Sequence, residues 1–270
     1  MSAAATVPAR RGFTLPRVVR SEWTKLRTLR STLWSLLAAV IAMAGLGPAV
    51  AAVQMSRWSH LDVHERARFD AIDAGVGGYH LAQLAVGVLG VLVITGEYST
   101  GMIRASLTVV PRRLPMLWGK LAVFAGVTFL TMLIASITAF FIGQALLSGT
   151  NLDASLSDPG ALRSVLGAAL YLTVAGITAL AIGALLRNTA AAITTFVAVF
   201  FVIPPLTNLL PRSFTDQFVQ YLPANAGAVM LDGTFGVAHP LAPWTGFAVM
   251  CAYAAVLTGL AAWRLHKVDA

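Results

Sequence analysis

The residues best suited to bind a metal ion lie close together near position 60. His60 and His64 are four residues apart, so both could face one side of a helix, and Asp62 and Glu65 add carboxylates. The sequence HERAR, however, lacks the second histidine of the H-E-x-x-H zinc pattern. Arginines alternate with these acids, which is typical of a solvated surface. We therefore interpret the segment as a solvated loop and expect no metal site there.

No other set of side chains suggests enzymatic chemistry. The sequence has no G-x-x-x-x-G-K-[ST] loop, and the glycines at 75, 77 and 78 lack the later glycine of a dinucleotide-binding fingerprint. We interpret these glycines as close-packing residues at helix contacts. A single cysteine, Cys251, cannot form an internal disulfide or a thiolate metal cluster. His80 belongs either to a substrate path or to the polar residues at a membrane interface. We expect no catalytic, cofactor-binding or metal-binding residue in this chain.

The amino-acid composition indicates the class of protein to which this chain belongs. Of the 270 residues, 57% are apolar and 11% are charged, and the mean hydropathy is +0.77. Soluble globular proteins average about 45–50% apolar and about 25% charged residues. The chain has too little charge to cover a soluble surface and too much hydrophobicity for disorder. These values predict an integral membrane protein.

Uncharged runs of membrane-spanning length mark six helices. The fold class is therefore an all-α polytopic membrane protein, with residues 1–31 as a tail and an interfacial helix and residues 32–270 as a six-helix domain. Ionisable residues deep in a span would mark an ion path, and we find none. Lys120 lies at the edge of the third run, and we expect it to extend toward the headgroups. The expected spans are about 32–53, 76–95, 117–146, 165–186, 189–210 and 244–263.

The distribution of basic residues predicts the orientation. Fourteen of the nineteen Lys and Arg residues lie on one side if the N-terminus is placed inside, and eight of the eleven acids lie on the other side. Cytoplasmic segments of membrane proteins carry the excess of Lys and Arg. Both termini are therefore expected in the cytoplasm.

Residues 15–31, LPRVVRSEWTKLRTLRS, predict an amphipathic basic helix before the first span. We expect it to lie in the headgroup plane, held by its apolar face and by anionic lipid, and to turn into the span at Ser31 or Thr32. Glu22 projects onto the apolar face and requires a partner. It either contacts another part of a complex or pairs locally with Lys25. The residues singled out in this helix are Glu22, Trp23, Lys25, Leu26, Arg27 and Arg30.

The longest predicted inner loop, residues 95–120, begins with an acid, Glu97, on the basic side of the membrane. Ser99 or Thr100 could cap a short helix over residues 102–107, which Pro111 would end. Such a helix is either a docking element for a soluble partner or a turn that lies on lipid.

Three segments of the chain resemble a known family. They are SEWTKLRTLRST (21–32), TGEYSTGMIRASLTVVPRR (95–113) followed by Lys120, and LPANAGAVM (222–230). They resemble the permease subunit of ABC transporters of the type-2 exporter class, in the actinobacterial style. The resemblance implies that the N-terminal helix is a connecting helix and that the loop after Glu97 contains a coupling helix. This coupling helix would dock on a separate ATP-binding-cassette subunit, which would hold ATP and Mg. The implied coupling residues are Glu97, Tyr98, Ser99, Thr100, Gly101, Met102 and Arg104.

The same resemblance implies further features of the assembly. Two permeases, identical or paralogous, would pair around a path in a bacterial cytoplasmic membrane. Segment 211–243 would form short helices that partly re-enter the outer leaflet, and Pro204 and Pro205 would break the fifth span. Phe214, Phe218 and Tyr221 are among the apolar residues available for such a helix.

The hypothesis that follows is the permease subunit of an ATP-driven transporter, an exporter by family resemblance, with no catalytic residues of its own. The alternatives are a non-transporting membrane scaffold or immunity protein, and a secondary carrier. The largely apolar path favours lipid-like, drug-like or hydrophobic peptide cargo, without identifying the substrate.

Overall fold

The computed structural model describes residues 15–58, 62, 66, 69–99, 113–148, 152–211, 217–231, 237 and 239–267. Throughout these residues the regular secondary structure is helical, with no strand. Six segments are long and apolar enough to cross a membrane, which confirms the predicted number of spans. These segments are Arg30–Ser56, Tyr79–Tyr98, Leu114–Leu147, Ala161–Leu186, Thr189–Leu209 and Pro243–Lys267.

The N-terminal helix and the first span meet at a sharp turn. Helix α1 covers Leu15–Thr28 and α2 covers Arg30–Ile41, with Leu29 between them in an extended conformation. The turn predicted at Ser31 or Thr32 is therefore placed too late, because Thr32 is buried in the first turn of α2 and is unavailable as a cap. Arg30, which we grouped with the interfacial helix, is instead the first residue of α2.

The first span changes its winding midway. A π-helical turn, η1 (Ala42–Leu46), joins α2 to α3 (Gly47–Ser56). Gly78 packs against this turn, and a methyl group on Gly78 would overlap the carbonyl oxygens of Ala42 and Met43. The predicted close-packing role of these glycines is thus confirmed at Gly78.

The second span begins after a short capped helix. Asp70 caps α5 (Ala71–Val76) by accepting hydrogen bonds from the backbone N–H groups of Ile72 and Asp73. Helix α6 then covers Tyr79–Ser99, so it begins later than the predicted span and continues through Glu97.

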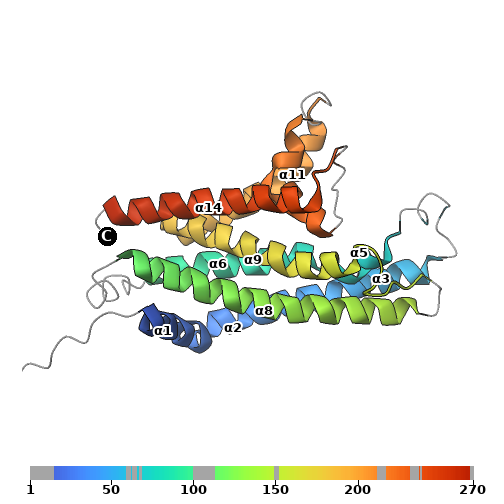
Figure 1. The fold of residues 1–270 in the computed structure, drawn as a ribbon, viewed down its shortest axis with the longest axis horizontal. Helices are drawn as coiled ribbons and strands as arrows, with labels where there is room; N and C mark the ends of the chain where they lie inside the picture. Colours follow the sequence, from blue (N-terminus) through green and yellow to red (C-terminus); the bar gives the residue numbers. More distant parts are fainter. Residues whose placement is uncertain are drawn as a thin grey trace, which may run out of the picture.

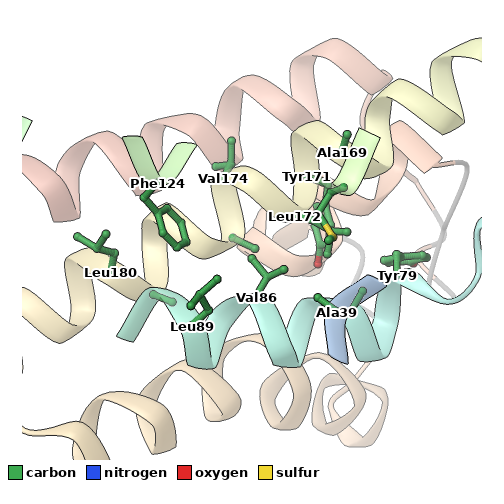
Figure 2. Packing of buried hydrophobic residues seen from close by; sticks show 14 of the residues in the cluster. Ala39, Tyr79, Val86, Leu89, Phe124, Ala169, Tyr171, Leu172, Val174 and Leu180 are labelled. Carbon is green, nitrogen blue, oxygen red and sulfur yellow. The ribbon is translucent and has the colours of Figure 1, made fainter. Parts of the chain in front are cut away.

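The third and fourth spans form the centre of the bundle. Helix α8 (Arg113–Leu147) has 35 residues, or about 52 Å at 1.5 Å per residue, and exceeds the ~30 Å hydrocarbon core. Helix α9 (Ala161–Leu186) is the most buried of the six spans, with 83% of its apolar 18-residue stretch buried. It packs against α6 and α8. Figure 2 shows Phe124 and Val86 in this core, and a Cβ atom added at Gly176 of α9 would lie 2.8 Å from each of them. Helix α14 (Pro243–Lys267) covers the other side of α9 (Figure 1).

The fifth span remains helical past its two prolines. It consists of α10 (Thr189–Val197), the π-helical turn η3 (Ala198–Val202), α11 (Ile203–Leu206) and the 3-10 turn η4 (Thr207–Leu209). The predicted break at Pro204 and Pro205 is therefore wrong. The prolines occupy the start of α11, where a missing N–H is tolerated, and the winding changes before and after them.

Short helices occur between the fifth and sixth spans, as predicted for segment 211–243. They are η5 (Val219–Tyr221), α13 (Pro223–Ala228) and η6 (Val229–Leu231), and Phe214 lies outside the described residues. Helix α13 and η6 are buried against α9 and α14, where Gly227 packs on the ring of Tyr171.

Candidate functional site

Helix α1 packs against the bundle through a narrow stripe. Val18, Glu22 and Leu26, spaced four residues apart, are each less than 8% exposed. A Cβ atom on Gly119 of α8 would lie 2.7 Å from Val18, so the helices approach closely there. The orientation of α1 in the headgroup plane stays a prediction, but part of the apolar face that we expected to contact lipid contacts the bundle instead. The stripe faces protein, whereas Val19 and Trp23 remain exposed.

Four charged side chains meet under this stripe. The ammonium of Lys25 lies 2.7 Å from one carboxylate oxygen of Glu22, and the ammonium of Lys120 lies 2.6 Å from the other. Both ammonium groups also lie 2.9 Å from Oε1 of Glu97. Two acids and two bases thus alternate, and the charge cluster, defined as Glu22, Lys25, Glu97 and Lys120, is neutral at pH 7.

The charge cluster joins three helices that are distant in sequence. Glu22 and Lys25 come from α1, Glu97 comes from the end of α6, and Lys120 comes from the second turn of α8. Lys120 is 23 residues from Glu97 and 98 residues from Glu22. The cluster therefore links α1 to both ends of the segment between the second and third spans.

The structure shows which side chains of this chain contact Glu22. The predicted pair with Lys25 is present, and a second, long-range contact with Lys120 lies within the same chain. The expectation that Lys120 extends toward the headgroups is wrong, because two carboxylates hold its ammonium and the residue is 2% exposed. The sequence signal was present: an acid ends one apolar run and a base begins the next.

Burial makes this arrangement sensitive to the loss of any one charge. Desolvation alone would lower the pKa of Lys25, but the hydrogen bonds and charges of Glu22 and Glu97 outweigh it and raise the pKa above its ordinary value. The second oxygen of Glu97, Oε2, is buried and accepts no hydrogen bond within the described part of the chain. A buried ion pair that loses one partner leaves an uncompensated charge in a low-dielectric site.

Neighbouring contacts fix the end of α6 to other spans. The guanidinium group of Arg187 lies 5.3 Å from the centroid of the Tyr98 ring. Thr189 donates a hydrogen bond to Thr95 at 2.9 Å, and Arg264 donates one to the carbonyl of Leu185. The α9–α10 junction, the end of α14 and the end of α6 thus meet at the same end of the bundle.

A comparison with protein families shows which family the chain belongs to. The family model described as "ABC-2 family transporter protein" matches residues 18–205, more than two thirds of the sequence. The chain belongs to the ABC-2 transporter family. The match confirms the resemblance at the level of this family, and the protein is a multi-pass permease subunit of an ABC transporter. A comparison with curated proteins gives no match.

The family match covers all four residues of the charge cluster in this ABC-2 permease. Of the residues implied in coupling, Glu97 lies in the cluster, and Tyr98 and Ser99 end α6. Thr100, Gly101, Met102 and Arg104 lie outside the described residues. On α1, Leu26 is buried in the core, whereas Arg27 is exposed.

The described residues of the permease contain no group of three or more metal-binding side chains. His60, His64 and Glu65 lie outside the described residues. His80 lines a cavity of about 390 Å³ at the far end of α6 from the charge cluster, together with Asp70 and Asp73. The charge cluster can hold the three helices together through its ion pairs.

Proposed function

We propose that this permease subunit couples ATP hydrolysis in a separate ATP-binding subunit to substrate export. The observation that carries the proposal is the charge cluster, which joins α1, α6 and α8 through Lys25, Lys120 and the two carboxylates. The segment that follows α6, residues 100–112, is the proposed docking element for the ATP-binding subunit. ATP and Mg would be held by that partner.

The charge cluster would make three helices move as one unit. Separating α1 from α6 or α8 would leave buried carboxylates or ammonium groups without partners, which costs several kcal/mol per ion. A displacement of the segment after Glu97 would therefore carry α1 and the start of α8 with it. The partner can drive this change only if it binds one permease conformation more tightly than the other.

We further propose that the charge cluster lies on the cytoplasmic side of a bacterial plasma membrane, with both termini inside. The last turns of two helices at this end support the proposal because they are basic. Lys25 and Arg27 lie in the last turn of α1, and Arg264 and Lys267 lie in the last turn of α14. Lys and Arg are enriched in cytoplasmic segments.

A second permease copy, identical or paralogous, would cover the fifth span. Within the apolar 18-residue stretch of Thr189–Leu209 only 17% is buried, compared with 83% for the corresponding stretch of α9. Pro204 and Pro205 lack N–H groups, so carbonyls of the preceding turn have fewer backbone donors available. Polar backbone groups at membrane depth require protein or water partners. A second copy at this face would supply such partners and enclose a path.

Co-purification tests the coupling proposal. The permease would be expressed with a candidate ATP-binding-cassette subunit from the same organism, and the amount of that subunit bound per permease would be measured. We expect Glu97→Ala and Arg104→Ala to reduce it, and Arg57→Gln, an exposed change at the opposite end of the first span, to leave it unchanged. Wild-type binding in both test variants would contradict the docking assignment.

A further inference from the structure

A groove runs between α1 and α8. Its volume is about 720 Å³. Val19, Arg20 and Trp23 line one wall, and Ala122, Gly126 and Leu130 belong to the other. Of the ten residues that line the groove, only Arg20 and Thr131 are polar.

The wall on α8 is hollowed by small residues. Ala122, Gly126 and Leu130 are spaced four residues apart and are exposed on one face of the helix. A Cβ atom added at Gly126 would have no neighbour within 4 Å, so open space lies above this residue. The lining extends from Ala122 to Thr131, or about 14 Å along the helix. This length is close to half of the ~30 Å hydrocarbon core, which is the depth of one leaflet.

The charges around the groove favour an anionic occupant. Arg20 is exposed and forms no ion pair with any residue in the described ranges. The only carboxylate of α1, Glu22, points into the charge cluster and is neutralised there. Trp23 is half-exposed at the groove wall, and indole side chains favour the boundary between headgroups and acyl chains.

We propose that this groove binds one acyl chain of an anionic phospholipid, whose phosphate is held by Arg20. The apolar walls match a chain of one leaflet's depth, and the guanidinium group matches the headgroup charge. The bound lipid would contact both α1 and α8 and would hold α1 in place independently of the charge cluster. The site does not depend on the coupling proposal, because it requires only that α1 lies at one membrane surface.

Lipid retention by the full-length purified permease tests the site. The protein would be incubated with phosphatidylglycerol or phosphatidylcholine carrying the same acyl chains, and bound lipids would be counted by native mass spectrometry. We expect the wild type to retain phosphatidylglycerol several-fold more than phosphatidylcholine. Gly126→Leu fills the groove and should reduce retention of phosphatidylglycerol, whereas Arg20→Gln should abolish the preference between the two headgroups.

Gly259→Leu is the matched control, because Gly259 is also exposed on a spanning helix with no atom within 4 Å of an added Cβ. It should retain lipid as the wild type does. Equal retention of both lipids by the wild type, or unchanged retention in Gly126→Leu, would overturn the proposal. If Gly126→Leu instead lowers the cross-linked dimer fraction and leaves lipid retention unchanged, the groove is an interface between two copies. Arg20→Gln changes only an exposed side chain and decides the question if Gly126→Leu fails to fold.

Discussion

The ammonium of Lys120 lies 2.6 Å from a carboxylate oxygen of Glu22, a residue 98 positions earlier in the chain. Both side chains are less than 5% exposed. This contact links the N-terminal helix to the third span. The Lys120 ammonium also lies 2.9 Å from Oε1 of Glu97, at the end of the second span. The charge cluster therefore connects three helices at the end of the second span.

Removing the ammonium of Lys120 should destabilise the permease. In Lys120→Met, Lys25 alone would face two carboxylates, and breaking a buried pair costs about 3–5 kcal/mol. We expect a lower midpoint of thermal unfolding in detergent. Arg57→Gln, an exposed substitution, should change the unfolding free energy by less than about 0.5 kcal/mol.

The energetic coupling between Lys120 and Glu97 should appear in a double-mutant cycle. Lys120→Met with Glu97→Gln leaves Glu22 paired with Lys25 and no net buried charge. The double variant should lose less stability than the sum of its two single variants. Strict additivity would show that the two residues do not interact.

Alkaline pH should loosen the attachment of α1. The pKa of Lys25 is raised in the folded state above 10.5, so its contribution to stability is complete below pH 10.5 and is lost as the pH rises through the raised pKa. Thermal unfolding between pH 9 and pH 12 should show this loss in the wild type. Lys25→Met should lack that part of the pH dependence. An identical pH profile in both proteins would rule out this role of Lys25.

A side chain at Gly78 should destabilise the permease, because the first and second spans lie too close together there to accommodate it. A methyl group there would overlap two backbone carbonyl oxygens of η1, which cannot move aside as a flexible side chain can. Overpacking of this kind costs about 1–3 kcal/mol, and unfolding measurements on Gly78→Ala should show it. Gly45→Ala is the control within η1, since an added Cβ there meets nothing within 4 Å. Equal stability of the two variants would refute the close approach.

A buried hydrogen bond between the second and fourth spans gives a separate test of the core. The hydroxyl of Tyr171 donates to Oε1 of Gln83 at 2.7 Å. Tyr171→Phe would leave that oxygen buried without a donor, at a cost of about 1–3 kcal/mol. Unfolding experiments should show this loss, whereas Tyr253→Phe on an exposed position should change little.

Uninterrupted apolar runs predicted the number of spans because burying an apolar segment of this length in lipid leaves few alternatives. The boundaries were less predictable, since they depend on tertiary contacts. Thr32, a good capping residue by type, is buried inside α2, and the turn falls at Leu29. Pro204 and Pro205, considered without their tertiary context, predict a break in the helix. In the structure a π-helical turn precedes them, and the chain stays helical through both prolines.

The candidate site was only half visible in the sequence. Glu22 and Lys25 are three residues apart, so their pairing followed from helical geometry. The contacts with Glu97 and Lys120 depend on how α1, α6 and α8 pack, which periodicity alone does not determine. An ionisable residue at each facing end of two consecutive apolar runs was the available signal.

ATP hydrolysis by the permease reconstituted with its ATP-binding subunit tests the central claim most directly. The comparison is between the wild type, Lys120→Met, and Lys120→Met combined with Glu97→Gln, each checked for folding and for bound partner. We predict that the single variant loses most of the permease-dependent ATP turnover and that the double variant regains part of it, because the buried charge is balanced again. Wild-type turnover in a folded, partner-bound Lys120→Met variant would contradict the account.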